Sequence, residues 1–289
     1  MLQVARLAPT MLGEAAPRVA DFLRSEQRPD GGFADRGGYS DLYYTVFALE
    51  GLLALQQPLP NAAVRDYAES FGGGSELDLV HLACLARCWS ILPTTMQADC
   101  PQEALVARLE ACRSADGGYA WQAGEAYGSL YNTFMVVGAY QDLRLPLPEQ
   151  DRLRDFVLGL RDPRAGFRQS RELPGALVPM TAGAVALLRQ LGAPPTDPAL
   201  RDWLLTCLDP QGGFRAAPAV PIPDLLSTAT ALHTLISWKI DLAPIRERCL
   251  DFIDSLWTNR GGFYGHWEDT HVDCEYTYYA LLSLGHLSL

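Results

Sequence analysis

Lysine is nearly absent from this sequence, and basic residues are few. Lys239 is the only lysine among 289 residues, and 23 basic residues face 34 acidic ones, for a formal net charge of -11. A nucleic-acid partner calls for a basic face that meets the phosphates. The composition therefore argues against nucleic-acid binding.

Paired cysteines and long apolar runs are also missing. The seven cysteines are odd in number and form no C-x-x-C pair, which argues against a disulfide framework or a zinc knuckle. No apolar run reaches the length of a transmembrane helix, and the first residues do not form a convincing signal peptide. We expect a cytoplasmic protein with reduced, buried thiols.

What the sequence has in abundance is internal repetition. An apolar residue, any residue, an aspartate and an aromatic recur with a spacing of about 47 residues, within the range of helical-hairpin repeats. The aromatic or equivalent positions are Phe22, Tyr67, Leu109, Phe156, Trp203 and Phe252.

A Gly-Gly-aromatic segment, reduced in one repeat, follows five of these positions about eleven residues later, within the same helical-hairpin repeat, and repeat two diverges. It reads Gly31-Gly32-Phe33, Gly117-Gly118-Tyr119, Gly212-Gly213-Phe214 and Gly261-Gly262-Phe263, with a reduced Ala165-Gly166-Phe167 and a divergent Phe71-Gly72-Gly73-Gly74. Because glycine accepts left-handed backbone angles, we interpret the pair as the C-cap that ends a helix.

Each repeat then continues into a helix that is apolar nearly all round, whereas the preceding helix is amphipathic. An apolar helix must be covered on both sides. We therefore predict an all-α protein, an α6–α6 toroid in which six helical hairpins form an inner and an outer ring. An open solenoid would need polar faces on its terminal repeats, and the first and last repeats here are as apolar as the others. The prediction is one domain over 1–289, with repeats at about 14–58, 60–94, 101–144, 149–192, 197–240 and 243–289.

Repeats of this kind resemble the β subunits of protein prenyltransferases, with Rab geranylgeranyltransferase nearest in character, and the squalene–hopene cyclases. The resemblance runs from about residue 14 to the C-terminus and implies an aromatic funnel that holds an isoprenoid, with its diphosphate near the mouth. It also implies a zinc ion at the mouth, Mg²⁺ with a diphosphate substrate, and an α-type subunit or a peptide acceptor as partner.

The zinc ligands that the resemblance implies are incomplete. By repeat order, the Asp-x-Cys position reads Asp224-Leu225-Leu226, and at the Asp-x-x-His position Tyr276 replaces the histidine. By local resemblance, the segment 272–276 matches the zinc-aspartate segment instead, with Glu275 at the cysteine position. Only the Asp78 segment keeps a histidine, His81. If a metal is bound, its ligands at the mouth are expected to be Asp41, His81, Asp273 and Glu275, since one histidine with carboxylates can hold a divalent ion.

The remaining candidate residues lie at the starts of the inner helices. The aspartates there are either N-caps or part of a site. Catalytic roles are expected for Asp224, Asp273, Glu275 and Tyr276. Substrate contacts are expected from the aromatic residues Tyr43, Tyr44, Phe47, Tyr131 and Phe134, which suit an isoprenoid or a carbocation, and from the cations Arg168 and Arg171, with Arg36 and Arg215 as further cations.

The sequence thus favours a protein that binds an isoprenoid diphosphate, or another apolar small molecule, and transfers or rearranges the prenyl group. A non-catalytic toroid that carries a lipid or docks a partner is the second hypothesis. A terpene-cyclase-like enzyme is the third. Two features count against it: no Asp-x-Asp-Asp acid is present, and the chain has length for one barrel, where those cyclases use two.

Overall fold

The computed structural model describes residues 1–289, and the chain forms two compact units. The first contains residues 1–60 and 201–289, and the second contains residues 61–200. Both are helical, as predicted, and the only sheet is a two-stranded one, β1 (Phe33–Ala34) with β2 (Ser40–Asp41).

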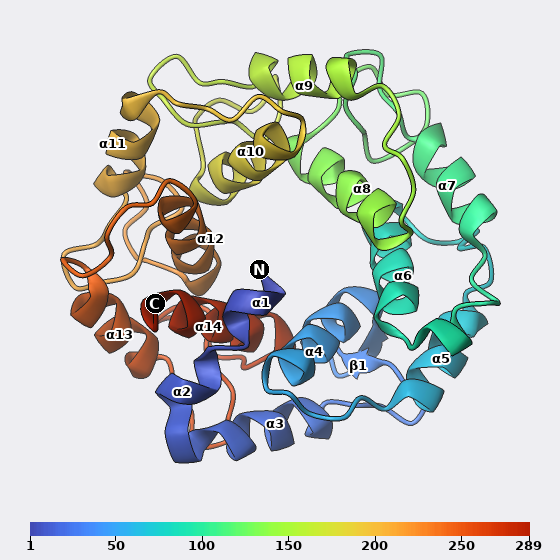
Figure 1. The fold of residues 1–289 in the computed structure, drawn as a ribbon, viewed down its shortest axis with the longest axis horizontal. Helices are drawn as coiled ribbons and strands as arrows, with labels where there is room; N and C mark the ends of the chain where they lie inside the picture. Colours follow the sequence, from blue (N-terminus) through green and yellow to red (C-terminus); the bar gives the residue numbers. More distant parts are fainter. The chain divides into compact units, whose positions relative to one another are not determined.

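The second unit has two layers of helices (Figure 1). Helices α6 (Leu79–Ile91), α8 (Leu130–Asp142) and α10 (Val178–Gln190) are neighbours. Against them pack α5 (Asn61–Ser70), α7 (Gln102–Ala111) and α9 (Gln150–Gly159), which are amphipathic or more polar. A short 3-10 helix, η2 (Thr94–Met96), links α6 to α7. This alternation is the predicted one of apolar and covering helices.

The first unit repeats this arrangement and joins the two ends of the sequence. Helix α14 (Cys274–Leu287) packs between α12 (Leu225–Ser237) and α4 (Leu42–Ala54). Helices α3 (Ala16–Ser25) and α13 (Arg246–Ser255) pack behind α4 and α14, and α11 (Pro198–Thr206) precedes α12. The last repeat therefore contacts the first, which an open solenoid would not allow.

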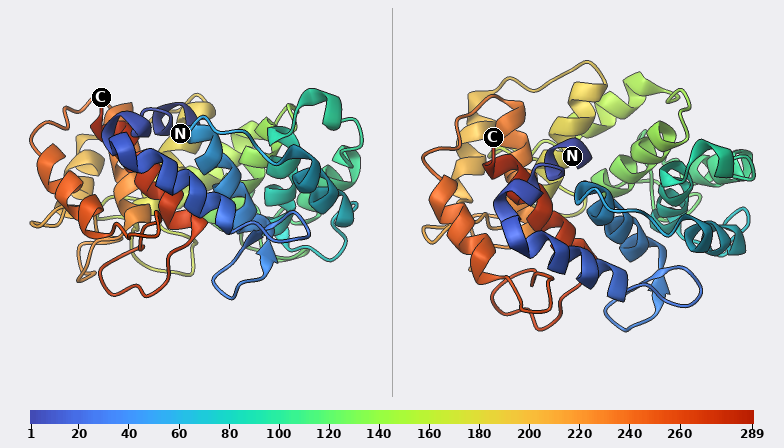
Figure 2. Two further views of the ribbon diagram at one scale, coloured as in Figure 1. Left: turned by 90° about the horizontal axis from the view of Figure 1, so that it is seen from below. Right: turned by 60° about the horizontal axis from the view of Figure 1, so that its bottom comes forward.

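Two short helices at the start of the chain lie beside α14 (Figure 2). They are α1 (Leu2–Ala5) and α2 (Ala8–Leu12), followed by the 3-10 helix η1 (Gly13–Ala15). The approach is close at Gly285, where an added Cβ would meet the carbonyl oxygen of Val4 at 2.1 Å. In both views of Figure 2, the loops that precede α4 and α14 project to the same side of the unit.

The glycine pairs do not cap helices, so this part of the sequence interpretation is wrong. Helix α3 ends at Ser25 with Glu26 as its C-cap in the right-handed region, whereas Gly31 has its positive φ in a later turn. The glycines are required by contacts between repeats instead. An added Cβ on Gly261 would meet the carbonyl oxygen of Arg18 at 2.2 Å, and one on Gly262 would meet the Phe22 ring at 2.7 Å.

The same contact recurs between other repeats. A Cβ on Gly118 would meet the Phe156 ring, and one on Gly213 would meet the Phe252 ring, both at 2.5 Å. The two motifs found in the sequence are thus partners: the glycine pair of one repeat receives the aromatic ring of the next. The contact between Gly262 and Phe22 joins the sixth repeat to the first by this rule.

In five of the six inner helices, all except α6, a threonine fixes the aromatic residue of its own turn. The buried backbone N–H of Phe214 donates to Oγ1 of Thr228 at 2.8 Å, and Oγ1 donates to the Asp224 carbonyl at 2.7 Å. Equivalent bonds hold Phe33, Tyr119, Phe167 and Phe263 to Thr45, Thr133, Thr181 and Thr277.

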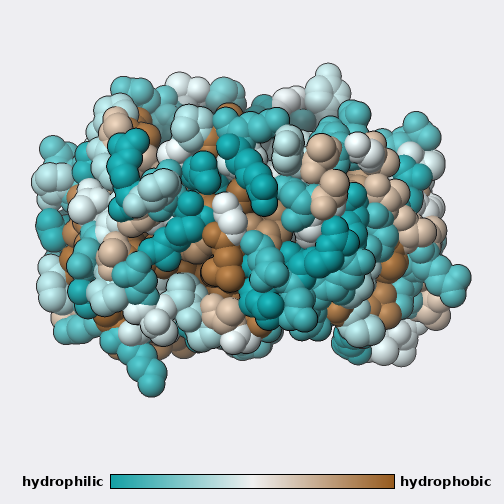
Figure 3. Space-filling view, turned by 90° about the horizontal axis from the view of Figure 1, so that it is seen from above, coloured by the Kyte–Doolittle hydropathy of each residue, from teal (hydrophilic) through white to brown (hydrophobic).

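Most of the face shown in Figure 3 is hydrophilic, with hydrophobic residues in patches between the hydrophilic ones. None of the helices combines the length and apolar character needed to span a membrane.

Substitution of Thr228 by valine should destabilise the protein by about 1–3 kcal/mol, because the buried N–H of Phe214 loses its acceptor. The control is Thr234→Val in the same helix, where the buried hydroxyl donates to the Thr230 carbonyl within the helix and no N–H depends on it in the same way. Chemical denaturation measures both. Equal losses in the two variants would contradict this role.

Candidate functional site

Aspartate side chains cap three inner helices of the first unit. Asp41, Asp224 and Asp273 accept the backbone N–H groups of Tyr44, Ser227 and Tyr276 at 3.1, 2.7 and 2.8 Å. In the second unit, Asp78 caps α6 by accepting the N–H of His81 at 2.9 Å. The N-cap interpretation of these aspartates is therefore confirmed.

Arg36 connects the loop between β1 and β2 to the start of α14. Its Nε donates to Oδ2 of Asp273 at 2.7 Å, and its Nη2 donates to Oδ2 of Asp269 at 2.9 Å. Burial by itself would lower the pKa of Arg36, but the two carboxylates raise it above its usual value. Arg36 therefore stays charged, and its charge is matched by two acids.

The two acids differ in their surroundings. Burial raises the pKa of Asp273, against the effect of its bonds to Tyr276 and Arg36. Burial acts in the same direction on Asp269, but the N–H groups of His271 and Gly265, with Arg36, hold the pKa of Asp269 below its usual value. Asp269 is thus the firmly ionised partner of the arginine.

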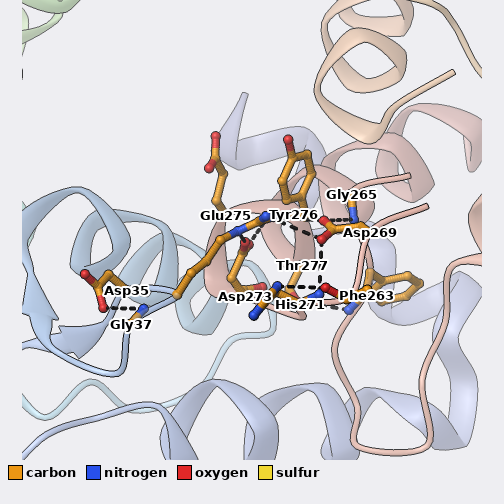
Figure 4. A network of polar contacts seen from close by, with 12 residues as sticks. Asp35, Gly37, Phe263, Gly265, Asp269, His271, Asp273, Glu275, Tyr276 and Thr277 are labelled. Atoms are coloured by element: carbon orange, nitrogen blue, oxygen red, sulfur yellow. Dashed lines mark hydrogen bonds and ion pairs between the residues drawn. The ribbon is translucent and has the colours of Figure 1, made fainter. Parts of the chain in front are cut away.

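The ring of Tyr276 is held between the loop and Arg36. The Arg36 guanidinium lies 5.3 Å from the ring centroid, a cation–π distance. On the loop, an added Cβ at Gly265 would meet the Tyr276 ring at 2.6 Å. Burial, with Glu275 and Asp224 nearby, raises the pKa of Tyr276, so its hydroxyl keeps its proton. Figure 4 shows this hydroxyl and the Glu275 carboxyl pointing the same way.

Glu275, at the start of α14, is an acid whose pKa the site raises to near neutral pH. Its Oε1 accepts the hydroxyl of Tyr43, from α4, at 2.7 Å. Burial raises the pKa of Glu275 to about 7, with Asp273 and Asp224 adding to the effect of burial and the Tyr43 bond opposing it. A carboxyl group with such a pKa can both give and take a proton near neutral pH.

Aromatic rings, including that of Tyr43, gather where α4 meets α14. Phe47 is in contact with Tyr43, Tyr278 and Tyr279, at centroid distances of 4.9, 5.7 and 5.3 Å. Tyr279 also contacts Tyr276, at 6.4 Å. Phe47 and Tyr279 are only half-buried, so part of this aromatic cluster, formed by Tyr43, Phe47, Tyr276, Tyr278 and Tyr279, is accessible.

All four residues predicted to be catalytic lie at inner-helix starts of the first unit. Asp224 accepts both the N–H and the hydroxyl of Ser227, each at 2.7 Å, and burial raises its pKa. Tyr44 is also there; burial, then Asp273 and Glu275, raise its pKa to about 12. Asp269 was not among the predicted residues, because nothing in the local sequence distinguishes it from other loop acids.

Arg215, in the first unit, lies 3.9 Å from Asp209. The remaining predicted residues belong to the second unit. His81 Nδ1 lies 2.8 Å from Oδ1 of Asp78, Tyr131 and Phe134 are half-buried in α8, and Arg171 lies 3.8 Å from Asp116. Arg168 is half-buried in the turn before α10.

The metal prediction rests on Asp41, His81, Asp273 and Glu275. The structure contains no group of three or more His, Cys, Asp or Glu side chains placed to hold a metal ion. Leu226 and Tyr276 stand where the resemblance implies a cysteine and a histidine. Both carboxylate oxygens of Asp224 are hydrogen-bonded to Ser227. These residues do not fit the zinc site of the resembled family.

Consecutive helical hairpins whose last member packs on the first define the α/α toroid class. A model of the prenyltransferase alpha-alpha toroid domain matches residues 12–69, 61–141 and 181–288. The chain therefore belongs to this family. The search of curated proteins finds no match.

Solved structures share the fold at low sequence identity. Type II terpene cyclase MstE from Scytonema, in complex with geranylgeranyl dihydroxybenzoate, is 13% identical with a TM-score of 0.63, covering 97% of both chains. Protein geranylgeranyltransferase-I of Candida albicans, complexed with GGPP, is 15% identical with a TM-score of 0.70, covering 93% of this chain and 90% of that one. An α-1,6-mannanase variant of Salegentibacter sp. is 12% identical with a TM-score of 0.63, covering 96% and 98%.

These likenesses establish the fold and leave the reaction open. They also overturn one argument from the sequence. A terpene cyclase is matched over 97% of its own length, so the length of this chain does not argue against a cyclase-like enzyme.

Stability should fall as the pH rises through the range in which Glu275 ionises. Because burial raises its pKa to about 7, the folded protein keeps a proton that the unfolded chain has released. This stabilisation is complete below the usual pKa and is lost as the pH rises towards 7. Between about pH 4.5 and pH 7, the wild-type unfolding free energy should fall by up to about 3 kcal/mol relative to Glu275→Gln.

Urea denaturation at a series of pH values measures this difference. Glu268→Gln, an exposed site in the neighbouring loop, makes the same change in net charge and should keep the wild-type pH dependence. Parallel wild-type and Glu275→Gln curves would show that Glu275 ionises normally.

Proposed function

We propose that this protein is an enzyme that binds a prenyl chain at the aromatic cluster and rearranges it by proton transfer from Glu275. The observation that carries the proposal is the position of Glu275: a carboxyl group with a pKa of about 7, hydrogen-bonded to Tyr43, whose ring contacts the half-buried ring of Phe47. The family and its isoprenoid-binding structural neighbours support a prenyl ligand.

Glu275 supplies what a proton-initiated reaction requires. A general acid works best when its pKa lies near the working pH, because it is then protonated often enough to act. In the proposed step the O–H bond of Glu275 breaks, and a C–H bond forms at one carbon of a prenyl double bond. The neighbouring carbon becomes cationic, and a second double bond of the chain attacks it to form a carbon–carbon bond. Loss of a proton to water ends the reaction, and the carboxylate takes a proton from solvent.

The aromatic cluster suits the cation that this step creates. Ring faces attract a positive charge, and the attraction grows where water is excluded. Phe47 contacts three tyrosine rings, so its ring is held in place before a ligand arrives. Tyr43 positions the carboxyl group from the same helix that carries Phe47.

Two other hypotheses are less well supported by this site. Zinc-dependent prenyl transfer needs a donor set that the residues here do not fit. A simple lipid carrier would not need an acid with a raised pKa, although it would use the same aromatic cluster. The proposal therefore separates binding from turnover, and the two can be tested by different variants.

Substitution of Glu275 by glutamine should lower turnover by about a hundredfold or more, the scale of a lost general acid. Wild-type protein is incubated with geranylgeraniol and geranylgeranyl diphosphate, and gas chromatography with mass spectrometry detects products isomeric with the substrate. Activity should fall as the pH rises above about 7, because the protonated form is lost. Glu268→Gln serves as the control. Full activity of Glu275→Gln, or release of diphosphate as the main reaction, would refute the mechanism.

Substitution of Phe47 by alanine should weaken binding of the prenyl chain by about tenfold or more, because an apolar contact surface is removed. Quenching of intrinsic fluorescence by geranylgeraniol measures the affinity. The matched control is Phe71→Ala, which removes a ring that packs on Tyr67 at the end of an outer helix. Equal affinities of the two variants would show that the prenyl chain lies elsewhere.

A further inference from the structure

Each inner helix of the first unit already has a carboxylate of this chain bonded at its N-terminus. The start of a helix attracts negative charge through its free N–H groups. Here the carboxylates of Asp41, Asp224 and Asp273 each accept one of those groups, at the starts of the three inner helices of the first unit. A ligand anion beside these N–H groups would meet the negative charge of a carboxylate already bonded there.

The rim formed by Arg36, Asp269, Asp273 and Tyr276 contains one arginine, and its charge is likewise already matched by acids. Arg36 donates to both Asp269 and Asp273, whose side chains are only 5% and 3% exposed, and its own is 37% exposed. Two acids therefore face one cation, and a diphosphate beside them would be repelled rather than held. Strong phosphate sites place unmatched Arg or Lys groups against the ligand.

Tyr276 and a protonated Glu275 add neutral hydrogen-bond donors at this place. The Tyr276 hydroxyl is fixed by the contacts of its ring with Gly265 and Arg36, and it points the same way as the Glu275 carboxyl (Figure 4). A protonated carboxyl group and a phenol both donate. Their natural partner is an oxygen acceptor that carries no charge.

We infer that the ligand of this site is an uncharged prenyl compound, with an alcohol, phenol or carbonyl oxygen at the rim formed by Arg36, Asp269, Asp273 and Tyr276, and not a prenyl diphosphate. This inference rests on the proposed function, because it assumes that the aromatic cluster binds the prenyl chain. It adds the chemical class of the group that the chain carries.

The test compares two ligands with the same prenyl chain, geranylgeraniol and geranylgeranyl diphosphate, by quenching of intrinsic fluorescence. Wild-type protein should bind the alcohol at least about tenfold more tightly, since like charges at a binding site are costly. The variant Asp269→Asn removes one of the two acids that neutralise Arg36. It should bind the diphosphate about fivefold more tightly than wild type does, with little change for the alcohol.

The matched control is Asp209→Asn. Asp209 is a loop acid of the same unit, 3.9 Å from Arg215, and its substitution changes the net charge equally. It should leave both affinities unchanged. If Asp269→Asn does not fold, the wild-type comparison still decides the question.

The outcomes separate the two proposals. Tighter binding of the diphosphate by wild type, lost in Arg36→Gln, would overturn the inference and leave prenyl binding intact. An equal gain in Asp269→Asn and Asp209→Asn would show a general charge effect and would also overturn it. Failure of both ligands to bind, or binding unaffected by Phe47→Ala, would overturn the proposed function and the inference with it.

Discussion

The contact between a glycine pair and the aromatic ring of the next outer helix is the constraint on which the rest of the structure depends. It occurs at Gly118 with Phe156 and at Gly213 with Phe252, where a Cβ would lie 2.5 Å from the ring. Gly262 makes the same contact with Phe22, which comes from the other end of the chain. A packing rule between successive repeats therefore also joins the last repeat to the first. As a consequence, α14 and α4 are neighbours, and the loops that precede them meet.

That meeting of chain ends produces the candidate site. Arg36 and Asp273 are 237 positions apart in sequence and 2.7 Å apart in the structure; Tyr43 and Glu275 are 232 positions and 2.7 Å apart. Burial at the seam, the place where the loops that precede α4 and α14 meet, acts differently on each group. Arg36 stays charged because two acids accompany it, whereas burial raises the pKa of Glu275 to about 7, and the bond to Tyr43 and the charge of Arg36 offset this only in part. The seam thus separates a compensated ion cluster from an acid that can transfer its proton.

The sequence predicted the parts of this structure that follow from periodicity and local bonding. The apolar and amphipathic helices, the contact of the last repeat with the first and the aspartate N-caps were all recoverable, because each depends on spacing or on residues three positions apart. The role of the glycines was not, because the ring that excludes a Cβ belongs to another repeat. Asp269 was missed for the same reason: its importance comes from Arg36, which only the folded seam brings near. A raised pKa depends on burial by distant residues, so Glu275 could be chosen from sequence as a candidate acid but not as a protonated one.

The toroid itself does not select a reaction, since a terpene cyclase, a protein prenyltransferase and a mannanase all share it with this chain. The selection must come from the charges placed at the inner-helix starts. A toroid that holds a diphosphate needs free N–H groups and unmatched cations there, and this chain places its own carboxylates beside both. Beside them lie the Glu275 carboxyl, the Tyr276 hydroxyl and the rings of the aromatic cluster. In the proposed function these groups act on an apolar molecule through proton transfer, so the acidity of the rim, which first counts against an isoprenoid diphosphate, is the feature that favours an uncharged prenyl compound.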